Sequence, residues 1–195
     1  MRLTNILNSA SRGKFCREKA DEIKSLAKSS VASKSADMTL QIKSAISQIR
    51  LIESQLKDVE VHIEGIYTEL NSVINTIPGI GAINGSMILS EIGDIRRFSN
   101  PSQLIAFAGL DPIVNQSGSF RAKSTRMSKR GSGVLRYALV NAAWNVSLNN
   151  ETFRNYYDEK FAQKGRHYAT LGHVAGKLTR IIFKMLKDNV AFDLP

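Results

Sequence analysis

Residues 42–73 read IKSAISQIRLIESQLKDVEVHIEGIYTELNSV, a run without proline in which apolar residues return every seven positions. One series is Ile42, Ile49, Leu56, Ile63 and Leu70, and a second series, three positions later, is Ala45, Ile52, Val59, Ile66 and Val73. Two such series place a narrow apolar seam along one side of an α-helix. We therefore expect a single coiled-coil helix over residues 38–75, within an all-α fold.

A seam of this kind must be buried against another surface. A coiled coil with a second copy of the chain would bury it, and the alternative is an intrachain hairpin in which the helix packs against the C-terminal helices. The flanking positions include Glu53, Glu60 and Glu69, so parallel copies would gain few salt bridges. We expect a homo-oligomer through the coiled coil, and the number of copies and the helix orientation stay open.

Residues 76–82 read TIPGIGA, a Pro-Gly turn between two apolar stretches. The pattern is typical of a helix-hairpin-helix, in which Gly79 and Gly81 let the backbone approach a phosphate and the N–H groups of the second helix bind it. The alternative is a plain corner between two helices. The second helix is expected to run to Ile92 and to end at Gly93.

The remaining chain carries further helix signals. Good N-caps stand at Asn100, Ser132 and Asn150, and the last helix is expected over residues 168–187. Only residues 113–114 and 118–122 are candidates for brief strand pairing, so the fold is expected to be all-α.

We expect three parts along the chain. Residues 1–37 form a basic, serine-rich segment with a helix over residues 14–28, residues 38–75 form the coiled-coil helix, and residues 76–195 form a compact helical domain.

Positive charge is concentrated in one segment. The chain carries a net charge of +10, and residues 112–136 contain six basic residues and no acidic one. The six are Arg121, Lys123, Arg126, Lys129, Arg130 and Arg136. Such a cluster favours a polyanionic partner, and the alternative is a solvated basic surface.

Other kinds of site find little support. One cysteine, Cys16, allows no internal disulfide, and with three histidines a zinc site is improbable. The acidic pairs Glu91/Asp94 and Asp158/Glu159 are too few for a two-metal site, and the first pair is better suited to capping or ending a helix. No apolar run is long enough to span a membrane, so we expect a soluble protein of the cytoplasm.

A serine precedes the basic run, in Gln116-Ser117-Gly118. A hydroxyl on a polar loop beside dense positive charge suggests phosphodiester chemistry, whereas a serine before glycine is ordinarily a turn residue. Composition alone does not separate Ser117 from Ser119, Ser124, Ser128 and Ser132.

Several strings in order resemble one transposase family. They are Pro78-Gly79-Ile80-Gly81, residues 90–98 (SEIGDIRRF), residues 104–112 (LIAFAGLDP), Gln116-Ser117-Gly118, residues 128–132 (SKRGS) and Leu135-Arg136. The family is the DEDD-type insertion-sequence transposases related to the Piv DNA invertases and the bridge-RNA-guided recombinases. The resemblance covers residues 76–187, and residues 1–75 resemble the middle segment of the family.

The resemblance implies a mechanism. In the family a serine of the Ser-Gly motif attacks the DNA phosphodiester and forms a covalent protein–DNA intermediate, and Ser117 matches it. The acids that bind magnesium lie in an N-terminal RuvC-like domain that is not found in this sequence, so no cofactor is expected in this chain itself. The basic run and the turn at Gly79 and Gly81 would follow DNA or guide-RNA phosphates, in the cytoplasm and on the nucleoid of a bacterium.

The sequence supports two candidate functions, which belong to different classes. In the first, the chain is the serine-bearing half of a recombinase, inactive alone and competent with the other half. In the second, it is a nucleic-acid-binding and dimerisation module without catalysis, such as a remnant or inhibitor of transposition.

Overall fold

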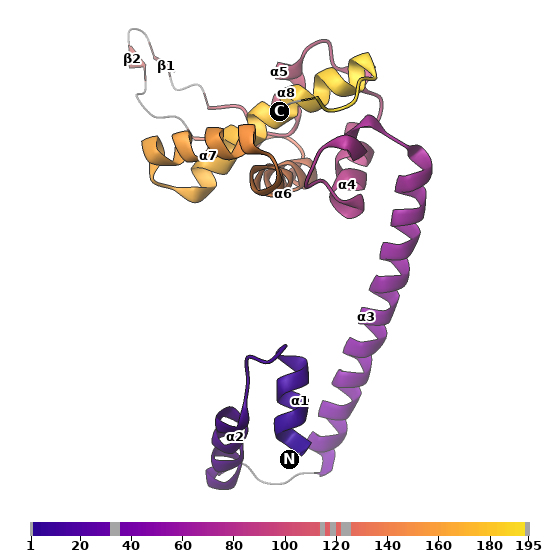
Figure 1. Ribbon diagram of the computed structural model, residues 1–195, viewed down its shortest axis with the longest axis vertical. Coiled ribbons are helices and arrows are strands. Elements are labelled where there is room, and N and C mark those ends of the chain that lie inside the picture. The colour runs from indigo at the N-terminus through magenta and orange to yellow at the C-terminus, as the bar shows by residue number, and fades with distance from the viewer. Residues whose placement is uncertain (1, 32–35, 114–115, 118–119, 122–125, 194–195) are drawn as a thin grey trace. The chain divides into compact units, whose positions relative to one another are not determined.

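The computed structural model describes residues 2–31, 36–113, 116–117, 120–121 and 126–193 (Figure 1). These residues confirm the all-α prediction, apart from a ribbon of two short strands. The chain divides into two compact units, Met1–Glu53 and Ser54–Pro195, which are described separately.

The first unit contains two short helices that contact each other, α1 (Arg2–Ala10) and α2 (Arg17–Ser29). The second agrees with the helix expected over residues 14–28, and α1 was not predicted. Ala20 is fully buried in this unit. Three cations of α2 are paired with its own acids, Arg17 and Lys24 with Asp21 and Lys19 with Glu22.

The long helix α3 (Ala36–Leu70) is continuous, as the heptad pattern predicts. It ends earlier than residue 75 because Asn71 adopts a left-handed conformation with φ 41°. Ser72 then caps a short 3-10 helix, η1 (Val73–Thr76), by accepting a hydrogen bond from the Ile74 N–H.

The rest of the second unit is a compact helical domain. Its further elements are α4 (Ala82–Ile92), η2 (Ile95–Arg97), α5 (Pro101–Phe107), α6 (Gly133–Asn149), α7 (Glu151–Lys164) and α8 (His167–Asp188). Helix α6 is central and packs against α4, α7 and α8, while α5 packs against α8. Ala138, Ala142 and Ala143 of α6 are fully buried, and such small side chains allow close packing on several faces.

The predicted N-caps of this domain are confirmed. The side chains of Asn100, Ser132 and Asn150 accept hydrogen bonds from the N–H groups of Gln103, Leu135 and Phe153, at 3.1, 3.0 and 3.1 Å. Gly93 and Gly165 follow α4 and α7 with positive φ, as expected of helix stops. Because each cap uses a local signal, the helix boundaries were readable from the sequence.

The Pro78-Gly79 turn leads from η1 into α4 and lies against α6. Gly79 has φ 92°, and a Cβ there would lie 2.7 Å from the Asn145 carbonyl of α6. Gly81 is the N-cap of α4 with φ −82°, and nothing lies within 4 Å of a Cβ built on it. The tight approach that requires glycine at position 79 is therefore an approach to α6.

An aromatic side chain near the C-terminal end of α3, Tyr67, packs on this domain. Tyr67 is buried against α4 at Gly85, where a Cβ would overlap the phenol ring. Burial raises the pKa of the Tyr67 phenol, and its Oη has no hydrogen-bond partner among the described residues.

Candidate nucleic-acid interface

Ser117 lies in a small antiparallel ribbon. Strand β1 (Gln116–Ser117) pairs with β2 (Phe120–Arg121), with Gln116 opposite Arg121 and Ser117 opposite Phe120. The rival Ser119 lies outside the described residues, as do Ser124 and the predicted phosphate contact Lys123. The ribbon includes part of the segment over residues 118–122 for which brief pairing was considered.

The two chain segments that flank the ribbon are joined to each other. The Ile113 N–H donates to the Arg126 carbonyl at 2.8 Å, and the Ser128 N–H donates to the Asp111 carbonyl at 2.7 Å. The Ser128 hydroxyl also donates to the Asp111 carboxylate. We call these contacts between residues 111–113 and 126–128 the clamp; it fixes where the ribbon leaves the domain.

The clamp continues onto the end of α5. The Lys129 N–H donates to the Gly109 carbonyl at 3.1 Å and the Ser132 N–H to the Phe107 carbonyl at 2.7 Å. A Cβ on Gly131 would overlap the Phe107 carbonyl, so only glycine fits there. Lys129 has φ 55°, a left-handed conformation that costs a non-glycine residue about 1–2 kcal/mol.

Two further side chains fasten the start of α6. The Ser132 hydroxyl caps α6 and donates to the Glu91 carboxylate at 2.7 Å. The Arg136 guanidinium is half-buried and donates from Nη1 to the Ala108 carbonyl at 3.2 Å. The hydroxyls of Ser128 and Ser132 are therefore both engaged in holding the fold.

The structure separates the predicted phosphate contacts into groups. Arg126, Lys129 and Arg130 are exposed, and no carboxylate among the described residues lies within ion-pair distance of them. Arg136 serves partly as an internal hydrogen-bond donor, and Arg121 lies in β2. Three unpaired cations at the base of the ribbon form a surface that favours phosphate.

Two acids outside the clamp, Asp94 and Glu159, serve local structure. Asp94 caps η2 and accepts hydrogen bonds from Arg96, which lower the pKa of the Asp94 carboxyl. Glu159 is paired with Lys160, whose hydrogen bond lowers the pKa of the Glu159 carboxyl. In the described part of the chain no three His, Cys, Asp or Glu residues are grouped so that they could hold a metal ion.

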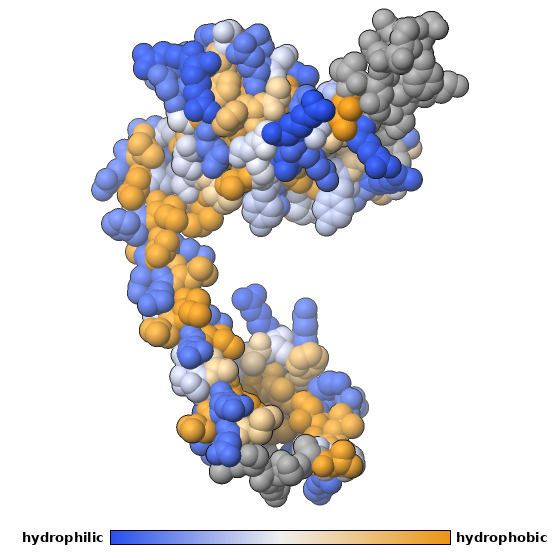
Figure 2. Space-filling model, turned by 180° about the vertical axis from the view of Figure 1, so that it is seen from behind, coloured by the Kyte–Doolittle hydropathy of each residue, from blue (hydrophilic) through white to orange (hydrophobic). Residues whose placement is uncertain are grey.

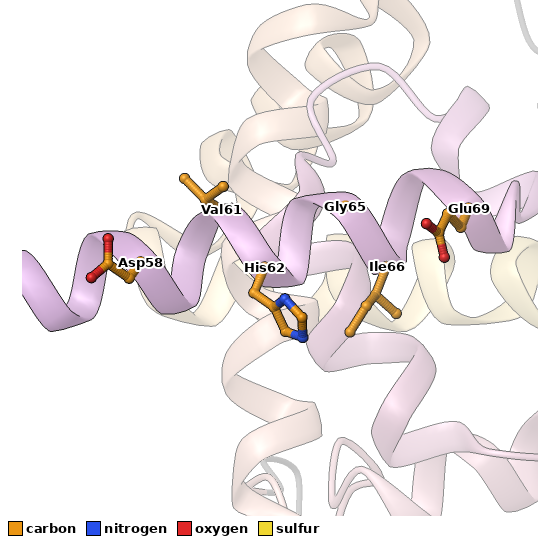
Figure 3. Close-up of a pocket in the computed structure, with 6 residues that line it drawn as sticks. All are labelled: Asp58, Val61, His62, Gly65, Ile66 and Glu69. Atoms are coloured by element: carbon orange, nitrogen blue, oxygen red, sulfur yellow. The ribbon is translucent and has the colours of Figure 1, made fainter.

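The second surface of interest is the seam of α3. Leu56, Val59 and Ile66 are 59%, 56% and 49% exposed, so the helices of their own unit do not cover them. Apolar side chains are visible along α3 in Figure 2. Around Gly65 the helix carries a shallow groove in which His62 and Ile66 project to the same side (Figure 3).

Sequence reasoning did not identify the clamp. Asp111 and Ser128 are 17 residues apart and Glu91 and Ser132 are 41 apart, beyond the reach of any local pattern. The sole local hint was the Gly-Ser-Gly run over residues 131–133, which signals both a close approach and a helix start.

Residues 71–158 match the family model described as Transposase IS116/IS110/IS902 family. The matched segment contains the turn at Gly79, the clamp, the ribbon, all of α6 and the first part of α7. No helix of the described residues is sufficiently long and apolar to cross a membrane.

The chain is also similar to curated proteins of mobile elements. It is 23% identical over 158 residues to the insertion element IS110 uncharacterized 43.6 kDa protein of Streptomyces coelicolor, covering 80% of this chain and 39% of that protein. It is 32% identical over 129 residues to the pilin gene-inverting protein of Moraxella bovis, covering 64% of this chain and 40% of that protein.

A shorter match reaches 36% identity over 70 residues with the transposase for insertion sequence element IS1111A of Coxiella burnetii, covering 36% of this chain and 19% of that protein. The chain thus spans about two fifths or less of the length of these relatives. The relatives whose names state an activity are a gene-inverting protein and a transposase.

Proposed function

We propose that this chain is the DNA-binding, serine-bearing part of a transposase or site-specific recombinase. The observation that carries the proposal is the ribbon at Ser117, whose flanking segments the clamp joins. Arg126, Lys129 and Arg130 follow the ribbon in the chain and are exposed, with no carboxylate of the described residues within ion-pair distance. The match over residues 71–158 supports it because that segment includes the whole arrangement.

In the proposed reaction Ser117 is the nucleophile. Its Oγ forms a bond to the DNA phosphorus while the bond from phosphorus to one deoxyribose oxygen breaks, and the proton leaves the hydroxyl and is finally carried by the released sugar hydroxyl. The cations at the base of the ribbon hold the neighbouring phosphates and offset the negative charge of the transition state. Ser128 and Ser132 suit this role less because their hydroxyls hold the clamp and α6.

Magnesium does not fit the described residues, which contain no group of three ligating side chains. Since the chain spans about two fifths or less of its relatives, we propose that the acids for magnesium belong to a RuvC-like domain of a longer protein. This chain would then be inactive alone. A guide RNA would bind through the same cations, because they recognise phosphate in either nucleic acid.

We further propose that two or more copies pair through the seam of α3. The exposed Leu56, Val59 and Ile66 support this, since a continuous apolar stripe on a long helix is stable in water when a partner helix covers it. A non-catalytic module that binds nucleic acid and pairs with intact protomers is the second candidate, favoured by the lack of a metal-binding group in the described residues.

The DNA-binding step is tested by salt dependence. Each phosphate contact adds about 0.9 to the slope of log affinity against log salt, so changing Arg126, Lys129 and Arg130 to Gln should lower the slope by up to about 3. The matched control changes Arg17, Lys19 and Lys24 to Gln, which removes the same charge from cations already paired within α2. Equal losses in the two triple variants would show non-specific attraction and contradict the proposed surface.

A further inference from the structure

Helices α6, α7 and α8 bring five aromatic side chains together at one place on the second unit. Trp144 of α6 meets the rings of Tyr157 and His167 with centroids 5.6 and 4.9 Å apart. Phe161 stacks on Tyr157 at 5.9 Å, and Tyr168 meets His167 at 5.2 Å. We call Trp144, Tyr157, Phe161, His167 and Tyr168 the aromatic cluster.

The cluster has a fixed inner layer and an open outer layer. Tyr157 and His167 are half-buried and joined by a hydrogen bond of 2.6 Å between the phenol oxygen and Nδ1. Trp144, Phe161 and Tyr168 are 37%, 42% and 81% exposed, and none of the three belongs to the main hydrophobic core. Contiguous exposed apolar surface of this kind is a feature of binding surfaces.

The charges around the cluster are those of a nucleic-acid surface. Exposed Arg166 directly precedes His167, and Arg154 donates from Nη2 to the Leu148 carbonyl at 2.6 Å, one turn beyond Trp144. Helix α6 itself contains no acidic residue. The acids of the neighbouring α7 are Glu151 in its first turn, Asp158 and Glu159, and Glu159 is paired with Lys160.

We propose that the aromatic cluster is a stacking platform for unpaired bases of a single-stranded nucleic acid. The inference rests on the proposed function, since strand cleavage and joining exposes single-stranded ends. Unpaired bases offer free π-faces to Phe161, Tyr168 and Trp144, and Arg154 and Arg166 lie where flanking phosphates would pass. Bases within a duplex are stacked on each other and do not reach such rings, so the platform selects unpaired nucleotides of DNA or RNA.

The experiment uses the only tryptophan of the chain, Trp144, as its own reporter. The full chain is titrated with a single strand of about twelve thymidines, matching the usual range of single-strand sites, while Trp144 emission is recorded. The comparison strand has the same number of phosphates and abasic sugars in place of the bases. The proposal expects the emission to be quenched by the thymidine strand and unchanged by the abasic strand.

Substitutions locate the effect. Tyr168→Ala and Phe161→Ala should each weaken thymidine-strand binding roughly 5- to 150-fold, the range expected for loss of one base–aromatic stack, while Tyr168→Phe keeps it. The matched control is Phe15→Ala, another exposed aromatic, in the first unit. Circular dichroism of each variant confirms that the helices are retained.

The outcomes separate this inference from the proposed function. Salt-dependent duplex binding with unchanged Trp144 emission and a neutral Tyr168→Ala would overturn the platform and leave the DNA-binding surface intact. If Trp144 emission changes with protein concentration in the absence of nucleic acid, the cluster is a contact between protein copies. That result would also overturn the stacking platform. Loss of all nucleic-acid binding in the native chain would reject both.

Discussion

At the scale of single residues, Gly79 has a structural requirement for glycine inside the fold, and its predicted phosphate contact stays a prediction. The sequence pattern assigned its lack of a side chain to an approach by phosphate, whereas the close neighbour in the structure is the Asn145 carbonyl of α6. With φ 92° and a neighbour 2.7 Å from the would-be Cβ, Gly79→Ala should lower the free energy of unfolding by about 2–4 kcal/mol. Urea denaturation measures this directly.

Gly81→Ala is the matched control from the same turn. Its φ of −82° suits any residue and its Cβ would meet open space, so we expect a loss below about 1 kcal/mol, from the poorer N-cap alone. If both alanines cost the same, the close approach of Gly79 to α6 is not what requires glycine. A selective loss of DNA binding in Gly81→Ala would support the predicted phosphate contact at the start of α4.

At Tyr67 we predict a substitution that does not lower the free energy of unfolding. Its buried hydroxyl lacks a partner among the described residues, and an unsatisfied buried polar group costs about 1–3 kcal/mol. Tyr67→Phe keeps the ring against Gly85, so the variant should be at least as stable as the native chain, by up to about 1 kcal/mol. A clear loss of stability on thermal or urea unfolding would mean that the hydroxyl has a partner, such as a bound water.

The same tyrosine gives a pH dependence. Its folded pKa is raised above the ordinary 10.0 by desolvation, so the folded state holds the proton more tightly than the unfolded chain. Its contribution to stability is therefore constant below pH 10 and falls as the pH rises above it. The stability difference between Tyr67→Phe and the native chain should widen in favour of the variant at alkaline pH. A constant difference would contradict the raised pKa.

At the scale of elements, the helices were predictable where local signals act. The heptad pattern predicted α3. The N-cap residues Asn100, Ser132 and Asn150 predicted the starts of α5, α6 and α7. The clamp was not predictable, because its hydrogen bonds join segments that only the folded domain brings together. The aromatic cluster was not predicted for the same reason, since its rings come from three helices.

The seam of α3 makes an element-scale prediction about assembly. Leu56→Glu combined with Ile66→Glu places charge in the seam. The molecular mass measured by sedimentation should therefore fall from that of an oligomer to that of a monomer. Val61→Glu is the matched control, because Val61 is equally exposed and lies outside both heptad series. A native chain that already sediments as a monomer at micromolar concentration would contradict pairing through α3.

At the scale of the whole molecule, two facts bear on the function: the net charge of the chain and the share of its relatives' length that it spans. The net charge of +10 and the acid-free segment over residues 112–136 fit a polyanion, and the chain spans about two fifths or less of its relatives. A composite active site follows from the proposal, with the serine supplied here and the metal-binding acids supplied by another domain. The non-catalytic module remains the competing account until the serine is tested.

The most direct test of the central claim is a covalent trap at Ser117. The chain is mixed with the RuvC-like domain of a relative, magnesium and labelled element-end DNA, then read on a denaturing gel, with the linked peptide identified by mass spectrometry. We predict a protein–DNA adduct on Ser117 that is lost in Ser117→Ala and kept in the control Ser25→Ala, which changes an exposed serine of α2. An adduct that persists in Ser117→Ala, or bound DNA that never becomes linked to the native chain, would contradict the nucleophile proposed here.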